Sequence, residues 1–182
     1  MSALTFLNTT QYIAQFVVNK GEQVVARLPG IAPGASLQVP SDDTYQVTAS
    51  TILEGNTYTS APATVTGAMG FVAQVKQNNL QGTYDFEMKV EASNAADQMV
   101  FQKTTIGPVT FTISKNGVYL QSVVVQNSFL VKTLQIGSTY SMYAVINGVT
   151  TDTAQTTNPS AVVTAELDNT DLESGYFTLS AL

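Results

Sequence analysis

Apolar and polar residues alternate along most of this chain. Between Asp43 and Ala49, for example, the apolar residues Tyr45, Val47 and Ala49 are separated by single polar residues. A period of two is typical of a β-strand with one face in a core and the other in water. Helical spacing is rare, and the best candidate, Ala92 to Gln98, is too short and uncapped to be more than a turn. The pattern therefore predicts an all-β protein.

Turn-forming residues recur about every eight to twelve residues, which is the spacing of a sandwich or barrel. Asn116-Gly117 is the strongest hairpin signal, because its turn type needs positive φ at both central positions, and Asn147-Gly148 is a second one. The strands predicted in the first half are residues 4–8, 12–19, 23–28, 36–39, 44–52, 57–65, 71–76 and 83–90. Those predicted in the second half are residues 100–103, 109–114, 118–126, 130–135, 139–146, 150–156, 161–167 and 176–180.

The stretch from Leu4 to Leu28 occurs twice, since it aligns without a gap on Met99 to Val123. The identical pairs are Phe6 and Phe101, Thr9 and Thr104, Thr10 and Thr105, Phe16 and Phe111, and Lys20 and Lys115. The same offset of 95 pairs Tyr45 with Tyr140. After a three-residue deletion, an offset of 92 pairs Tyr84 with Tyr176. The matched positions are mostly apolar, so the repeat indicates a duplicated scaffold.

We therefore predict two tandem antiparallel β-sandwich domains, immunoglobulin-like in architecture and arising from an internal duplication. The first copy covers residues 1–92, the second covers residues 99–182, and residues 93–98 form the linker. A unit of this size can still enclose a small core. The alternative is a single pseudo-symmetric assembly in which the two copies share strands.

Composition excludes several classes of function. Hydrophobic residues make up 44% of the chain and charged residues only 11%, so Thr, Ser, Asn and Gln must form most of the polar surface. Thirteen acidic residues against seven basic ones give a formal charge of -6. Nucleic acid is therefore not an expected partner, because its binding depends on cationic contacts to phosphate. No apolar run approaches 18 residues, so we expect no transmembrane segment.

The sequence contains neither cysteine nor histidine. Disulfides, thiol nucleophiles, histidine-based acid/base catalysis and the usual zinc sites are therefore excluded. Asp42 and Asp43 directly precede the predicted strand 44–52, and adjacent residues of extended chain point to opposite faces, which does not suit a pair of glycosidase carboxylates. We predict no catalytic residue, no enzyme activity and no bound cofactor.

The start of the chain has neither a basic n-region nor an apolar h-region, so it lacks the pattern of a signal peptide. We expect synthesis in the cytoplasm, with leaderless release or incorporation into a virion as the alternatives. The lack of cysteine agrees with a reducing compartment.

Two groups of residues are weak candidates for a site. Asp168, Asp171 and Glu173 supply three carboxylates within six residues and could hold Ca²⁺, although their spacing is not that of an EF-hand and turns favour such residues anyway. Tyr58 and Tyr119 lie in threonine-rich strands and present the amphipathic surface that sugars or proteins bind. Packing within a sheet is the commoner role of tyrosine.

Two further residue pairs recur in both copies. Tyr84 and Tyr176 are most simply explained by packing. Lys20 and Lys115 are expected to be solvated turn flanks or to protect edge strands from aggregation.

These features favour a non-enzymatic protein that binds a partner or assembles with itself into an oligomer. A lectin-like carbohydrate-binding module is the first alternative, and a secreted toxin or pore-forming β-protein is the second. A local function should lie where the copies differ, namely at Pro29 to Pro40 against Val124 to Gln135, and at the Asn78 loop against the Asp168 loop.

Overall fold

The chain is all-β, as the alternating pattern predicts. A computed structural model describes residues 1–168, 170 and 176–182, and within these residues the chain forms 18 strands and no helix. No segment of the described residues is therefore a helix that could span a membrane. Side chains point inward at every second position, as in β1, where the apolar Leu4 and Phe6 and the polar Asn8 are buried and their neighbours are not.

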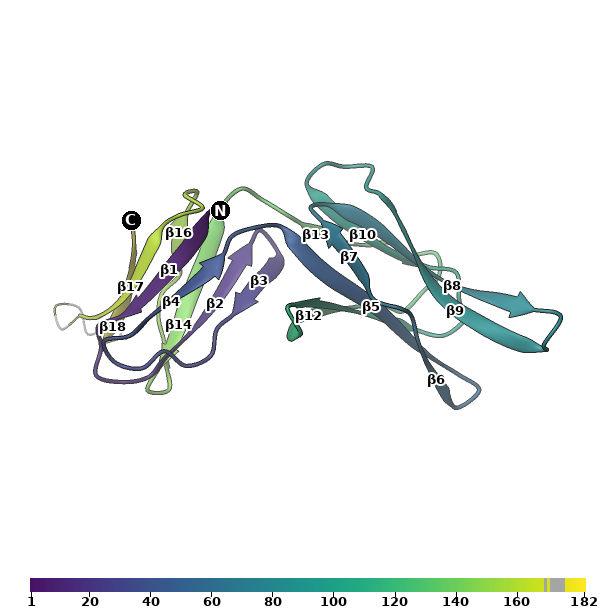
Figure 1. Ribbon diagram of the computed structural model, residues 1–182, viewed down its shortest axis with the longest axis horizontal. Helices are drawn as coiled ribbons and strands as arrows, with labels where there is room; N and C mark the ends of the chain where they lie inside the picture. The colour runs from purple at the N-terminus through teal and green to yellow at the C-terminus, as the bar shows by residue number, and fades with distance from the viewer. Residues whose placement is uncertain (169, 171–175) are drawn as a thin grey trace. The chain divides into compact units, whose positions relative to one another are not determined.

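The observed strands follow the predicted ones closely (Figure 1). In the first copy they are β1 (Ala3–Asn8), β2 (Ala14–Lys20), β3 (Gln23–Arg27), β4 (Ser36–Pro40), β5 (Thr44–Leu53), β6 (Asn56–Thr59), β7 (Ala63–Thr66), β8 (Met69–Asn78) and β9 (Thr83–Ala92). In the second copy they are β10 (Gln98–Lys103), β11 (Val109–Lys115), β12 (Val118–Val125), β13 (Lys132–Gln135), β14 (Tyr140–Ile146), β15 (Val149–Thr150), β16 (Ala154–Thr156), β17 (Val162–Leu167) and β18 (Phe177–Ala181).

The chain divides into two compact units. Unit 1 consists of residues 1–42 and 137–182, and unit 2 consists of residues 43–136. Unit 1 contains a sheet with the order β18-β17-β1-β4 and a sheet with the order β15-β14-β2-β3, in which β16 also pairs with β14. Unit 2 contains a sheet with the order β13-β10-β8-β9 and a sheet with the order β12-β11-β5-β6, in which β7 also pairs with β5.

Each unit combines strands of both copies. In unit 1, β1 of the first copy pairs with β17 of the second, and β2 pairs with β14. In unit 2, β10 pairs with β8 and β11 pairs with β5. Figure 1 shows purple strands from the start of the chain beside green and yellow strands from its end. The unit boundaries therefore differ from the predicted division at residues 93–98, because each copy contributes its first four strands to one unit and its remaining strands to the other.

Equivalent phenylalanines form the centre of both cores. In unit 1, Phe6 on β1 and Phe16 on β2 are fully buried, with ring centroids 5.1 Å apart. In unit 2, the aligned Phe101 and Phe111 are also fully buried, with centroids 5.2 Å apart, and Phe71 stacks on Phe101 at 5.3 Å. Each contact between aligned rings joins the two sheets of its unit, so both units are sandwiches.

The strand order departs from the predicted immunoglobulin-like, fully antiparallel arrangement. In the immunoglobulin constant domain the second and third strands lie in different sheets, whereas β2 and β3 pair within one sheet. In addition, β1 runs parallel to β17, and β10 runs parallel to β8. Both parallel pairings join strands of different copies, which a hairpin turn could not connect.

Two strands predicted as continuous, residues 57–65 and 150–156, are each divided in two. At one break, the buried Ser60 hydroxyl accepts a hydrogen bond from the Ala49 amide at 2.9 Å, and the Ser60 amide donates to Ala49 O. At the other, the buried Thr151 hydroxyl accepts from the Ala144 amide at 3.0 Å, and the Thr151 amide donates to Ala144 O. A buried hydroxyl thus replaces a ladder partner at the same place in both units.

Lys20 and Lys115 do not protect edge strands. Lys20 lies on β2, between β14 and β3, and Lys115 lies on β11, between β5 and β12. The Nζ of Lys20 is 5.5 Å from the centroid of the Tyr140 ring, within range of a cation–π contact.

Candidate functional site

Four connections meet at one end of unit 2. Because β10 runs parallel to β8 and β11 runs antiparallel to β5, the β10–β11 loop lies at the same end as the β5–β6 and β8–β9 turns. The β12–β13 loop joins them, since the Ser128 hydroxyl donates to Thr105 O at 2.8 Å. Each of the longer connections exposes a large apolar side chain: Leu80 is 98% exposed, Ile106 97% and Phe129 97%.

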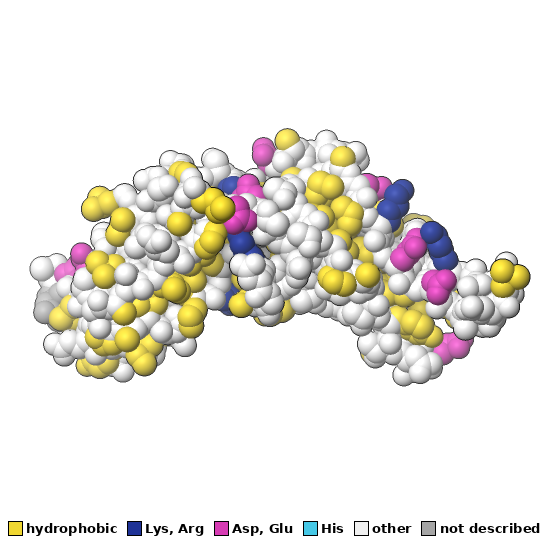
Figure 2. Space-filling view, viewed as in Figure 1, with side chains coloured by type: hydrophobic (Ala, Val, Ile, Leu, Met, Phe, Trp, Pro, Cys, Tyr) yellow, Lys and Arg dark blue, Asp and Glu magenta, His cyan; other side chains and the backbone are white. Residues whose placement is uncertain are grey.

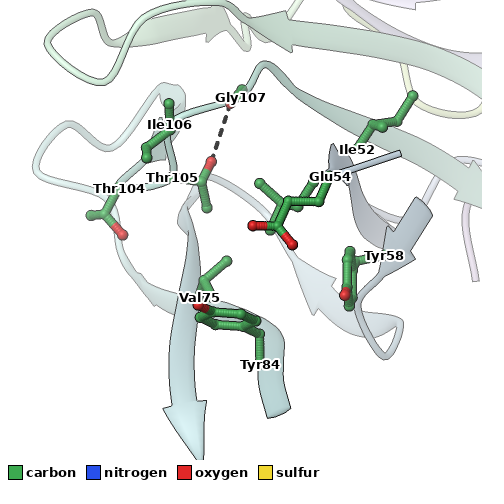
Figure 3. A pocket seen from close by; sticks show the side chains of 10 residues that line it. Ile52, Glu54, Tyr58, Val75, Tyr84, Thr104, Thr105, Ile106 and Gly107 are labelled. Atoms are coloured by element: carbon green, nitrogen blue, oxygen red, sulfur yellow. Dashed lines mark hydrogen bonds between the residues drawn. The ribbon is translucent and has the colours of Figure 1, made fainter. Parts of the chain in front are cut away.

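A groove of about 480 Å³ opens between the two sheets at this end (Figure 3). Its volume lies in the range of small-molecule sites. Residues of both copies line it: Ile52, Leu53, Glu54, Tyr58, Val75 and Tyr84 from the first, and Thr104, Thr105, Ile106 and Gly107 from the second. The interleaved pairing of strands is therefore what creates the groove.

Strand register turns two tyrosines toward this groove. Tyr58 lies opposite the buried Thr51 across β5 and β6, and residues directly opposite each other share a face of the sheet. Tyr84 lies opposite Gln77 on β8, on the same face as Val75. The two rings therefore extend from different sheets into the space between them, and Tyr84 remains 49% exposed.

Glu54 occupies the β5–β6 turn at the edge of the groove. Its φ is 49° and that of Gly55 is 79°, so both central residues of the turn are left-handed. The equivalent turn of unit 1 uses Asn147-Gly148, with φ of 50° and 75°, and asparagine is the residue that tolerates this conformation best. Glutamate costs about 1–2 kcal/mol more than an unstrained conformation here. Figure 3 shows the Glu54 carboxylate turned into the groove.

A buried lysine fixes the loop that closes the groove. Lys103 is only 2% exposed, and its Nζ donates to Thr105 O at 2.8 Å and to Ser128 Oγ at 3.2 Å. The Thr105 hydroxyl donates to Gly107 O at 3.2 Å, the dashed line in Figure 3. The buried Lys103 ammonium group therefore links the β10–β11 loop to the β12–β13 loop.

The equivalent end of unit 1 is built differently. Asn8 stands where unit 2 has Lys103, and Tyr12 stands where unit 2 has Gly107. The Tyr12 ring packs edge-on against the buried Phe177, with centroids 5.9 Å apart. In unit 2 a Cβ on Gly107 would lie 3.2 Å from Ile52 O, so the loop there packs directly on the β5 backbone. The replacement of an aromatic ring by glycine leaves room for the groove.

The outer face of the β8–β9 hairpin carries charge instead of apolar groups. Lys76 Nζ lies 2.6 Å from Glu87 Oε1, Lys89 pairs more loosely with Glu91 at 3.9 Å, and Gln74 also donates to Glu87. The hydrogen bond from Lys76, supported by that from Gln74, lowers the pKa of Glu87. Figure 2 shows these charges on a surface that is otherwise mostly uncharged.

The two tyrosines predicted as ligand-binding residues do not form one site. Tyr58 lines the groove. Tyr119 lies on β12, at the opposite edge of the same sheet, three strand spacings or roughly 14 Å across the sheet and five residues further along the strands. It pairs with Ser114 next to the buried Leu120, so its ring faces outward.

Tyr84 is the groove residue that sequence reasoning assigned to packing. The difference could have been found from the length of its hairpin, because β8 and β9 have ten residues each whereas β17 and β18 have six and five. The extra residues carry Tyr84 beyond the core.

The predicted Ca²⁺ ligands lie partly outside the described residues, which exclude Asp171 and Glu173. The Asp168 carboxylate accepts hydrogen bonds from the amide and the hydroxyl of Thr170, the first at 2.8 Å. This is the pattern of a turn-forming aspartate. The described part of the chain contains no group of three acidic residues arranged to hold a metal ion.

Comparison with protein-family models, curated proteins and solved structures finds no match to this chain. The chemistry of the groove is therefore the basis for a functional proposal.

Proposed function

We propose that this protein is a non-enzymatic binding protein whose ligand site is the groove at the loop end of unit 2. The groove carries the proposal, because it combines inward-facing tyrosines with aliphatic side chains in a concave site of ligand size. It also lies where the two copies differ, between the long β8–β9 hairpin and the Gly107 loop.

This location is supported by the contrast between the loop end of unit 2 and the equivalent end of unit 1. Packing explains shared residues of the cores, such as Phe6 and Phe101. At the groove Tyr84, Thr104 and Thr105 have identical counterparts, but the copies diverge in charge and size at Glu54 and Gly107, and large apolar side chains remain in water. Such exposure is unfavourable for the isolated protein and is typical of interaction sites.

Filling the groove tests this proposal. Thr104 is exposed and lines the groove, so Thr104→Trp should occupy the groove without disturbing the core. Thr133 is exposed on β13 and is absent from the groove lining, which makes Thr133→Trp the matched control. The probe is the uncharged dye Nile red, whose emission rises in apolar sites. Wild type and the control should bind it equally, and Thr104→Trp should weaken binding at least tenfold. Equal binding by all three proteins would overturn the proposal.

We also propose self-association as a second function, and an internal duplication as the origin of the two copies. The interleaved topology favours both. Unit 1 closes only when residues 1–42 pair with residues 137–182, and the same pairing could join two chains. Exchange of an identical element between protomers is a low-cost route to oligomers.

Refolding at different protein concentrations tests self-association. Chains refolded at high concentration should include dimers that persist on dilution, because their release requires unpairing of β1 and β2. Sedimentation velocity measures the species. A monodisperse monomer after refolding at every concentration would contradict the proposal.

A further inference from the structure

We propose that the groove binds an organic cation with an apolar body, such as an alkylammonium group. This inference rests on the proposed function and adds the chemical class of the ligand. It depends on three neighbouring side chains, those of Glu54, Tyr58 and Tyr84 (Figure 3).

Charge selects a cation over an anion. Among the residues that the structure describes, Glu54 is the only charged one that lines the groove. Among the described residues no cation forms an ion pair with Glu54. Lys103 is the basic residue next to the β10–β11 loop, but it is buried, and its Nζ donates to Thr105 O and Ser128 Oγ. A bound ammonium group would therefore meet an unpaired carboxylate, whereas an anion would meet only repulsion from a chain whose formal charge is -6.

The aromatic rings select the kind of cation. The faces of tyrosine rings attract ammonium groups, most strongly where water is excluded. Tyr58 and Tyr84 come from different sheets and both line the groove, whose volume of about 480 Å³ leaves room for a ligand. Val75 and Ile106 supply aliphatic surface for an apolar body. A small hydrated metal ion would gain nothing from these groups.

The backbone at Glu54 is a further indication. The turn of unit 1 has asparagine where unit 2 has glutamate, and both positions are left-handed. A residue that adopts an unfavourable backbone conformation with no compensating structural contact is expected at functional sites. Among the described residues, the Glu54 side chain has no hydrogen-bond partner that would explain a glutamate here, whereas it is long enough to carry a carboxylate into the groove.

Calorimetry with three probes that share a hexyl tail tests this inference: hexyltrimethylammonium, hexanol and hexyl sulfate, all below their micelle concentrations. The ammonium probe should bind at least tenfold more tightly than hexanol, and hexyl sulfate should bind most weakly. Added salt should weaken binding of the ammonium probe, because an exposed carboxylate is screened.

Variants then separate charge, ring and turn effects. Glu54→Gln and Tyr84→Leu should each weaken binding of the ammonium probe at least fivefold. Glu166→Gln on β17 and Tyr119→Leu on the outer face of β12 are exposed controls that should leave it unchanged. Glu54→Asn should abolish the preference for the cation while raising the melting temperature of unit 2 by roughly 4–8 °C, since asparagine suits this turn.

Equal affinity for the ammonium probe and hexanol, or unchanged binding by Glu54→Gln, would overturn the inference. In that case Nile red binding that is lost in Thr104→Trp would still support the groove as a binding site. Failure of Thr104→Trp to affect Nile red would instead remove the proposed function itself.

Discussion

Asn8 offers a test of how the two copies are combined. It is fully buried at the end of β1, and its side chain makes four hydrogen bonds. Its Nδ2 donates to Tyr12 O at 2.7 Å and to Ile31 O at 2.8 Å, and its Oδ1 accepts from the amide and the hydroxyl of Thr10 at 3.0 and 2.7 Å. Asn8→Asp preserves the shape but replaces both donors by an acceptor.

The expected loss of stability follows from these contacts. Two hydrogen bonds disappear, at about 1 kcal/mol each. A carboxylate also becomes buried against two carbonyl oxygens, which costs several kcal/mol more. We expect a total of about 4–6 kcal/mol, a large part of the stability of a small domain. The deficit should shrink in acid, because a neutral carboxylic acid can donate one hydrogen bond again.

Hydrogen–deuterium exchange resolved by peptide shows where the loss appears. Because β1 pairs with β17, and Asn8 lies in unit 1, exchange should rise in β14, β17 and β18 and stay unchanged in β5 to β9. This result is expected even if unit 1 fails to fold. Faster exchange in β5 to β9, with β14 to β18 still protected, would refute the reasoning.

Three further predictions concern unit 2. Phe101→Ala removes a fully buried ring and should lower the free energy of unfolding by about 3–5 kcal/mol in urea titrations. Burial, together with the Asp43 carboxylate, raises the pKa of Tyr45. The stability from neutral Tyr45 is therefore present below the ordinary tyrosine pKa and is lost as pH rises beyond about 10. Tyr45→Phe should flatten this alkaline decline in denaturant midpoints. Lys76→Ala should raise the pKa of Glu87 toward its ordinary value in an NMR titration, because the pair is exposed and otherwise independent of the core.

Local pattern was sufficient to predict the strands and much of the core. Alternation identified β5, and the shared residues Phe6, Phe16, Phe101 and Phe111 proved to be the buried rings of two similar cores. These features depend on neighbouring residues in sequence and on burial of one strand face, which a sequence records directly.

Pairing of strands was not predictable in the same way. The aligned copies have similar apolar faces, so the hydrophobic pattern alone does not distinguish β8 from β17 as the partner of β1. The chain passes from one unit to the other at residues 41–43 and 136–138. The alternation of apolar and polar residues does not predict these crossings, and they decide which strands pair. The tandem division at residues 93–98 followed from assuming that each copy pairs with itself.

The groove was only partly predictable for the same reason. Tyr58 was identified as a candidate because it stands in a polar strand. Tyr84 and Ile106 join it only because β8 pairs with β10, which brings residues of both copies to one end. The replacement of Tyr12 by Gly107 in the second copy is a sequence difference that points to the site only once the two loops are known to be equivalent.

Disulfide trapping tests the interleaved arrangement most directly, because the chain has no cysteine of its own. Gln15 lies opposite Val145 across β2 and β14. A tandem arrangement would place it opposite Ser50 instead, since the aligned Thr110 pairs with Ser50. Opposed Cα atoms in antiparallel strands are about 4.5–5.5 Å apart, within disulfide range. We predict an intrachain disulfide in the monomer of Gln15→Cys/Val145→Cys and none in Gln15→Cys/Ser50→Cys. The opposite result would contradict the shared sandwiches and the groove that depends on them.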